Sequence, residues 1–229
     1  MKILAVDTAT EQCSVALSID NTVTARCLQT QRGHADIILP MIQEVLDEAG
    51  TTLKQLDAIA FGRGPGAFTG VRIAIGVAQG MAFACDLPVV GVSNLAAVAQ
   101  QAANSGGEIL ICMDARMSEV YWGCFKFEGA LVVPATLEQV CKPEVVSAAI
   151  KRNSLVPTQA LGTGFKAYPE LRQHLLNCSV HEAALPCATE IAALAIRDFA
   201  AGLGVEASAA EPVYLRDQVV HVRPHPPAP

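Results

Sequence analysis

The sequence predicts an α/β protein made of two lobes that repeat one order of elements. Each half opens with an apolar strand that ends in an aspartate, first at 2–7 and again at 109–114. Each half then continues with two further strands, a helix, a strand and a closing helix, which is a βββαβα order. The glycine turn at 62–64 also has an echo at 162–164. Because this order occurs twice, we interpret the chain as a duplicated fold.

The first half begins with three strands and a helix. Strands are expected at 2–7, 13–19 and 22–29, and the last two are joined by a hairpin turn at Asp20-Asn21. A helix is expected at 34–49, because its apolar residues recur at helical spacing and a glycine follows it. Its apolar stripe is wider than one core contact requires.

The run from 62 to 92 organises this half. A strand at 56–61 leads into a glycine-rich turn at 62–70, then a helix at 71–85 and a strand at 88–92. A helix behind such a turn can attract phosphate. The turn lacks the spacing of a Walker A loop or a dinucleotide fingerprint, because Pro65 and Phe68 interrupt it.

The helix at 71–85 has two apolar faces of small side chains. One face contains Val71, Ala74, Ala78, Ala82 and Cys85, and the other contains Ile73, Val77, Gly80 and Ala84. A surface helix needs only one apolar face. The second face therefore predicts burial by more of this chain or by another chain.

The second half repeats these elements after a glycine-rich boundary near 104–107. Its expected elements, after a helix at 94–103, are strands at 109–114, 119–127, 130–138 and 156–161, helices at 142–152 and 189–201, and an extended stretch at 211–216. We therefore expect a first lobe at 1–105 and a second lobe at 106–216, with the helix at 189–201 packing back on the first lobe. A flexible, proline-rich tail is expected at 217–229.

Composition argues for a cytoplasmic globular protein that does not bind RNA alone. The net charge is -6, and no basic stripe is present. Asp7 interrupts the first apolar run, so no signal peptide is expected. Arg72, Asp86 and Pro88 interrupt the most apolar window, so no membrane span is expected. The eight cysteines include no Cys-x-x-Cys motif, which argues against a cysteine zinc site.

Several motifs carry a resemblance to known proteins. The two halves resemble the actin, sugar-kinase and Hsp70 superfamily. Four segments resemble, in the same order over nearly the whole chain, the bacterial TsaB family, also called YeaZ; they are residues 1–11, 62–72, 114–121 and 211–216.

This resemblance implies a role in making threonylcarbamoyladenosine next to the anticodon of tRNA. In proteins of this kind the chemistry belongs to a related protein, TsaD, which transfers the threonylcarbamoyl group to adenine. TsaB pairs with TsaD, and the ATPase TsaE joins them. The resemblance implies that tRNA is bound only through this complex.

The resemblance also implies that this chain has no catalytic or metal-binding residues of its own. TsaD-type proteins have a His-x-Glu-x-His pattern that holds a metal, and the matching positions here are Asn94, Ala96 and Val98. His221 and His225 are four residues apart, but the prolines beside them prevent a helix, so we interpret them as tail residues.

No firmly bound cofactor is expected. Superfamily ATPases have a glycine two residues after the first aspartate, where this chain has Ala9. Asp7, Asp114 and Arg116 are candidates for weak binding of ATP or ADP with magnesium. An alternative for Asp7 is that it orients the following turn, and an alternative for the other two is a local ion pair.

We therefore expect a non-catalytic partner subunit whose first two helices contact a TsaD-type protein. The residues assigned to this interface are His34, Ile37, Met41, Val71, Ala74 and Ala78. The same surface is expected to form a homodimer when the partner is absent. The alternative function is a small ATP-dependent kinase or hydrolase that uses Asp7 and Asp114.

Overall fold

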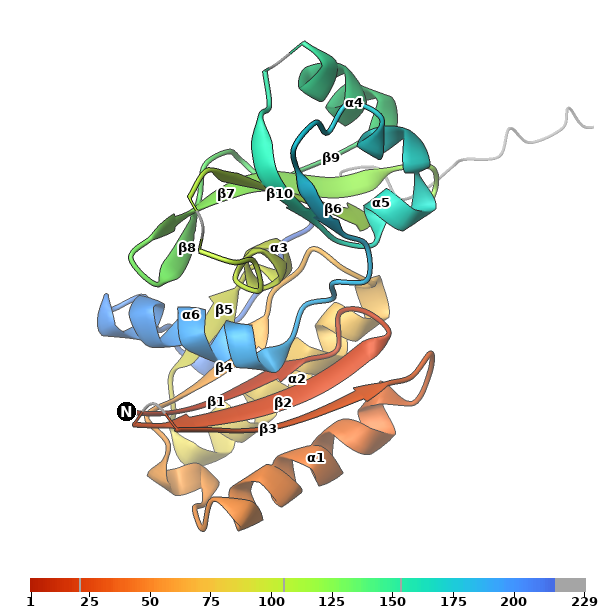
Figure 1. Cartoon of the computed structure of the whole chain (residues 1–229). Helices are drawn as coiled ribbons and strands as arrows, with labels where there is room; N and C mark the ends of the chain where they lie inside the picture. Colours follow the sequence, from red (N-terminus) through yellow and green to blue (C-terminus); the bar gives the residue numbers. More distant parts are fainter. Residues whose placement is uncertain (21, 105, 153, 217–229) are drawn as a thin grey trace, which may run out of the picture.

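The computed structural model describes residues 1–20, 22–104, 106–152 and 154–216 of the 229-residue chain. Two sheets alternate with layers of helices along the long dimension of the molecule (Figure 1). The tail expected at 217–229, with His221 and His225, lies outside the described residues.

The two sheets have the same topology, which confirms the duplicated α/β fold. The first has the order β3-β2-β1-β4-β5, and the second has the order β11-β10-β6-β7-β8, with β9 pairing on β7. In the first sheet β1 is antiparallel to β2 and parallel to β4. In the second sheet β6 is likewise antiparallel to β7 and parallel to β10. The first sheet contains β1 (Lys2–Asp7), β2 (Gln12–Ile19), β3 (Thr22–Gln29), β4 (Ala58–Gly62) and β5 (Val89–Val92). The second contains β6 (Glu108–Asp114), β7 (Val120–Glu128), β8 (Leu131–Pro134), β9 (Gln139–Cys141), β10 (Pro157–Leu161) and β11 (Ser179–His181).

Helices cover both faces of each sheet. The outer face of the first sheet carries α1 (His34–Glu48) and α2 (Phe68–Cys85), and that of the second carries α4 (Pro143–Lys151) and α5 (Gly164–Ala167) (Figure 1). Between the sheets lie α3 (Asn94–Ala99) and α6 (Ala188–Ala200). Short 3-10 turns occur at η1 (Leu53–Gln55), η2 (Pro169–Arg172) and η3 (Ala207–Ala209).

The last helix of each half packs on the sheet of the other half. Helix α3 ends the first half but packs on β6, β7 and β8, whereas α6 ends the second half but packs on β1, β2, β4 and β5. The two helices also contact each other. Their apolar side chains join one core that spans both lobes.

Burial on both faces explains why β1 is a continuous apolar run. Leu4 and Val6 point into the core under α1 and α2, whereas Ile3 and Ala5 point into the core shared with α3 and α6. All four side chains are fully buried. A strand with two buried faces loses the alternation of polar and apolar residues that marks a half-exposed strand.

Besides β9, β11 and α5, which were not expected, three elements differ clearly from the sequence-based expectation. Helix α2 begins at Phe68, because the turn before it already bonds in helical fashion from the amide of Val71 to the carbonyl of Ala67. Helix α3 ends at Ala99, after which the amide bonds tighten to a three-residue spacing. The strand expected at 130–138 is shorter, because β8 ends at Pro134 and the next two amides both donate to the carbonyl of Cys124; a separate strand, β9, follows from Gln139.

The expected partner face of α2 was wrong. Val71, Ala74 and Ala78 are 2%, 0% and 0% exposed, and they pack in the core under the first sheet. Met41 of α1 is also buried in this core. The opposite side of α2 faces outward, and Phe83 on it is 85% exposed. Small side chains on the buried row let the helix approach the sheet closely.

Helix α2 also has the length and composition of a membrane span. Its 18 residues have a mean hydropathy of 1.4. A core helix of a soluble protein has the same composition. Since one side of α2 packs against β1 and β4, that packing accounts for much of its apolar character.

Replacing Ala78 with arginine should unfold much of the protein. The arginine would place a charge without a partner in the core, at a cost on the order of 3–5 kcal/mol. Urea denaturation of Ala78→Arg measures this cost. The matched control is Val145→Arg on α4, where the side chain is 55% exposed and the free energy of unfolding should stay near that of the wild type. A folded Ala78→Arg protein of unchanged stability would contradict this orientation of α2.

Candidate functional site

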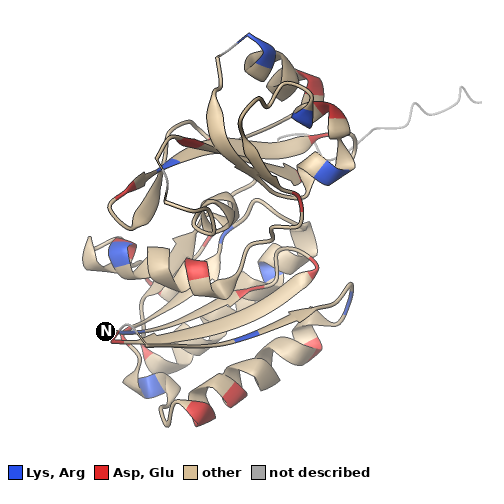
Figure 2. Cartoon of the chain, in the orientation of Figure 1, with Lys and Arg blue, Asp and Glu red and all other residues tan. Residues whose placement is uncertain are grey.

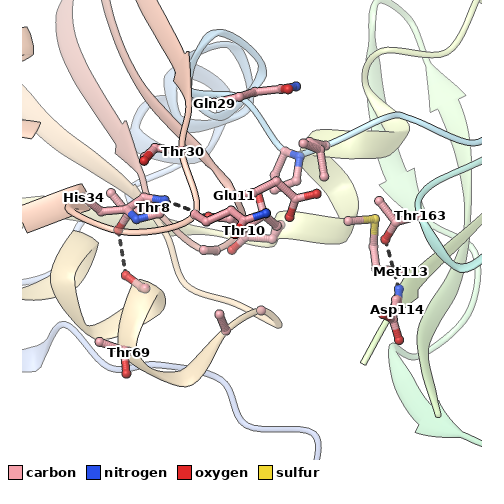
Figure 3. A pocket seen from close by; sticks show the side chains of 18 of the residues that line it. Thr8, Thr10, Glu11, Gln29, Thr30, His34, Thr69, Met113, Asp114 and Thr163 are labelled. Carbon is pink, nitrogen blue, oxygen red and sulfur yellow. Dashed lines mark hydrogen bonds between the residues drawn. The ribbon is translucent and has the colours of Figure 1, made fainter. Parts of the chain in front are cut away.

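A cleft with a volume of about 1560 Å³ opens between the lobes. Thr8, Thr10 and Glu11 line it from the first lobe, and Asp114 and Thr163 line it from the second. Figure 3 shows these two groups of side chains facing each other across the cleft. The turn after β1, the end of β6 and the turn after β10 supply them, so the cleft lies where the opening strands of both halves end.

Buried hydrogen bonds join the end of β1, the turn after β4 and the start of α3. The Nδ2 of Asn94 donates to Oδ1 of Asp7 over 2.7 Å, and the amide of Gly64 donates to Oδ1 of Asn94 over 2.7 Å. Asp7 is 0% exposed and Asn94 is 2% exposed. A side chain at Gly62 would collide with both, so glycine is required there. The aspartate therefore orients the turn and the start of α3.

Burial changes the acidity of this aspartate. It raises the pKa of the Asp7 carboxyl from 3.8 to about 7, while the hydrogen bonds from Asn94 and from the amide of Ala9 act in the opposite direction. A carboxyl held in this way lacks the exposed negative charge that a hydrated magnesium ion prefers. The sequence had left open whether Asp7 holds an ion or orients a turn, and its contacts favour the turn.

The two turns that would cradle a phosphate pack against each other instead. Ala9 is fully buried, and a side chain on Gly66 would lie 2.8 Å from its methyl group. The amide of Ala67 donates to the carbonyl of Ala9, and the hydroxyl of Thr8 donates to the carbonyl of Gly70. These contacts fill the space next to the backbone where a phosphate would need to approach, so the residues at this point do not fit a tightly held nucleotide.

The second lobe offers more accessible polar groups. Asp114 accepts hydrogen bonds from the amide of Arg116 and the hydroxyl of Tyr168, and pairs with the Arg116 side chain over 3.1 Å. The Arg116 side chain is 85% exposed, whereas that of Asp114 is 17% exposed. The local ion pair expected for these two residues is therefore present, and both line the cleft. Burial raises the pKa of Tyr168 next to this carboxylate.

The expected interface residues are not brought together on one surface. His34 lines the cleft, where its Nε2 donates to the carbonyl of Thr10 over 2.9 Å and fastens the start of α1. Ile37 is half-buried against the core, and Met41 lies in it. Periodicity alone could not separate these positions from outward ones.

No catalytic serine is formed at the start of α3. Ser93 is 7% exposed, accepts a hydrogen bond from the amide of Ala96 and donates to the carboxylate of Glu138. Burial raises the pKa of Glu138, while Ser93 and the nearby charge of Arg63 lower it. This serine caps the helix and links the lobes. Among the described residues no cluster of three or more His, Cys, Asp or Glu is placed to hold a metal ion.

Sequence reasoning missed the role of Asn94 and the contribution of Thr163. Asn94 was considered only as a lost ligand position, although its contact with Asp7 spans 87 residues of chain. The hydroxyl of Thr163 accepts from the amide of Asp114. The repeated glycine pattern around Thr163 was the available signal.

The comparisons with known proteins agree closely with each other. Residues 28–226 match the family model of TsaD, tRNA N6-adenosine threonylcarbamoyltransferase. The tRNA threonylcarbamoyladenosine biosynthesis protein TsaB of Escherichia coli is 44% identical, over 96% of each chain, and that of Haemophilus influenzae is 40% identical, over 96% of this chain and 95% of its own. YeaZ from Pseudomonas aeruginosa has a TM-score of 0.83 at 43% identity, covering 93% of this chain and 99% of its own. A second Pseudomonas aeruginosa structure, described as similar to peptidase YEAZ, has a TM-score of 0.85 at 44% identity and covers 94% and 99%.

The buried Asp7 should make the protein less stable as pH rises. Its folded pKa lies above its unfolded pKa, so the folded state holds the extra proton between about pH 4 and pH 7. The free energy of unfolding should therefore fall across this range, by on the order of 4 kcal/mol from this group, and level off above it. Burial also raises the pKa of Glu138 and Glu190, which adds to the decline.

Urea denaturation of Asp7→Asn from pH 5 to pH 8 tests this expectation. An amide does not titrate, so the variant should lose most of the decline and keep only the part due to Glu138 and Glu190. The matched control is Asp47→Asn on the exposed side of α1, which should keep the wild-type decline because Asp7 is intact. Equal slopes for Asp7→Asn and wild type would contradict the assignment.

Proposed function

The chain belongs to the TsaB (YeaZ) family of tRNA threonylcarbamoyladenosine biosynthesis proteins, and on this premise we propose that it is a non-catalytic subunit that works with a TsaD-type transferase. The observation that supports the proposal is that the side-chain amide of Asn94 is already hydrogen-bonded inside the fold. Its amide is bonded on both sides, to Asp7 and to Gly64, at a position where the resemblance implies a metal-binding histidine in TsaD-type proteins. The second such position, Val98, is fully buried and apolar.

The same reasoning supports weak rather than firm nucleotide binding. Ala9 packs on the glycine turn, and Asp7 is buried with a raised pKa. Asp114 and Arg116 line the cleft and are the groups that ATP or ADP with magnesium would meet there. The alternative, a kinase or hydrolase using Asp7 and Asp114, needs both carboxylates at the cleft, but only Asp114 lines it.

The partner surface that we propose is the outer face of α2, defined as Ile73, Val77, Gly80, Phe83 and Ala84. It replaces the buried row that the sequence suggested. A side chain added at Gly80 would meet nothing within 4 Å. Phe83 is 85% exposed, which is unusual for a large aromatic side chain and typical of a contact site. Glycine and alanine here let another helix approach the backbone closely.

Helix α1 would form the rim of this interface. Leu39 is 55% exposed and lies on the flank of α1 opposite to the one that faces β3. Glu44 and Glu48 mark the β3 flank, because both pair with Arg26 of that strand. Acidic residues predominate along α1 in Figure 2, so a partner with basic residues beside an apolar helix fits this surface.

The family resemblance also suggests the further members of the complex. A TsaE-type ATPase would join the two proteins, and tRNA would bind through the complex, in keeping with the net charge of -6. Without its partner the chain would pair with a second copy through the outer face of α2. A cytoplasmic location suits a tRNA modification protein.

The purified chain alone should bind no stoichiometric zinc or iron and turn over ATP far below the typical enzyme value of about 10 per second. Elemental analysis and a steady-state ATPase assay measure both properties. Firmly bound metal, or turnover near that value, would overturn the subunit proposal.

Replacing Gly80 with arginine should abolish partner binding without unfolding the protein. The monomer can leave the arginine in water, and loss of glycine even favours the helix by roughly 1 kcal/mol. In the complex the charge would be trapped, and a loss of about 3 kcal/mol weakens binding roughly 150-fold. Isothermal titration with a TsaD-type protein, beside thermal melting, measures both effects.

Val145→Arg on α4 serves as the matched control and should bind normally. A folded Gly80→Arg protein with wild-type affinity would remove this face from the interface.

A further inference from the structure

A second, smaller pocket adjoins the main cleft and shares Ala67, Arg116 and Tyr121 with it. It has a volume of about 220 Å³ and is formed by the turn before α2, the turn between β6 and β7, and the segment 213–216. Val71, Val213 and Leu215 contribute apolar walls, and Arg116 and Arg216 contribute charged ones. Its size suits one planar ring system, since pockets for whole drug-sized ligands begin at about 300 Å³.

Two exposed aromatic rings stand at this pocket. Phe68 and Tyr214 stack with their ring centroids 5.7 Å apart and an angle of 28° between the planes. They are 58% and 46% exposed. The guanidinium of Arg72 lies 3.4 Å from the Phe68 centroid and 5.2 Å from that of Tyr214. The result is a stack of two rings and one guanidinium group whose aromatic members are about half exposed to solvent.

The stack of Phe68 and Tyr214 is not needed to hold the segment 211–216 in place, because other hydrogen bonds already do so. The amide of Val213 already donates to the carbonyl of Arg63 over 2.8 Å. Arg216 already binds Glu119 through Nε over 2.9 Å and the carbonyl of Ala115 over 3.2 Å. These bonds tie the segment to both lobes, whereas rings used only for attachment would be buried.

Three arginines gather here, of which Arg116 and Arg216 pair with Asp114 and Glu119. Within the part of the chain that the structure describes, Arg72 has no carboxylate partner. Arg116 extends an 85% exposed side chain beside the pocket and pairs only with Asp114. Exposed aromatic rings next to a guanidinium group without a carboxylate partner, here that of Arg72, are the chemistry with which proteins hold unpaired RNA bases and their phosphates.

We propose that this pocket, lined by Phe68, Arg116 and Tyr214, and Arg72 beside it bind one unpaired nucleotide of the tRNA, with the base on the rings and its phosphate on the arginines. The inference rests on the proposed function, because that function brings tRNA to the complex. Phe68 and Arg72 lie on the flank of α2 shared with Gln79, which bonds to the carbonyl of Ala210. Of the outer face of α2 that we assign to the protein partner, Ile73, Val77, Gly80 and Ala84 lie on another side of the helix. Phe83 shares the flank of Arg72 but lies about 16 Å further along the helix axis, so both sites can be occupied together.

Photo-crosslinking of the assembled complex tests the site. The probe is an anticodon stem-loop whose unpaired positions carry 5-iodouridine, bound to this chain together with a TsaD-type protein. Mass spectrometry should place the crosslink on Phe68 or Tyr214. Phe68→Leu should weaken RNA binding at least fivefold, about the smallest loss expected when a stacking ring is removed, while Phe68→Trp should retain it.

Arg72→Gln should lower the slope of log K against log salt by about 1, because one phosphate contact is lost. The matched control is Arg152→Gln, an exposed cation at the end of α4, which should leave the slope unchanged.

Each other outcome overturns the inference. Crosslinks elsewhere, with Phe68→Leu binding RNA normally in an intact complex, would exclude this RNA site and leave the proposed function standing. Release of the TsaD-type protein by Phe68→Leu would make the pocket a protein-docking site instead. If the two wild-type proteins do not associate, the proposed function fails, and the same crosslinking on the concentrated isolated chain still decides the RNA site.

Discussion

The exchange of α3 and α6 between the lobes is the constraint on which the rest of the structure depends. Each sheet buries its inner face only because the closing helix of the other half covers it. Separating the lobes would expose the shared core, including Ile3, Ala5, Ile109 and Ile111. Burial of apolar surface on this scale opposes wide opening of the cleft.

This arrangement also decides what Asp7 can do. Because α3 begins at the junction of the lobes, Asn94 reaches both Asp7 and Gly64. The aspartate at the end of β1 then acts as an acceptor inside the fold, and burial raises its pKa to about 7. The equivalent position in the second lobe, Asp114, stays at the cleft beside Arg116. Duplication thus supplied two similar strand ends, and packing gave them different roles.

Helix α2 separates three environments around its circumference. The Val71, Ala74 and Ala78 row lies against the sheet, Gln79 bonds toward the segment before 211, and Phe83 faces solvent. A helix of small side chains suits this position, because it can pack closely on one side and still receive a second helix on another.

The sequence by itself determined most of the strands, the duplicated order and the existence of two apolar faces on α2, because these follow from local periodicity and from turn residues. It did not predict the short strands β9 and β11. It also located Asp7, Asp114 and Arg116 near the ends of the opening strands. Tertiary structure alone decided which face of α2 is buried, that Met41 is a core residue, and that Asn94 binds Asp7. Both apolar faces of α2 consist of small side chains, so periodicity could not show which of them is buried. The position of β1 and β4 beneath the helix decides this. The Asp7–Asn94 contact joins residues far apart in the chain, and no local pattern records the packing that brings two such side chains together.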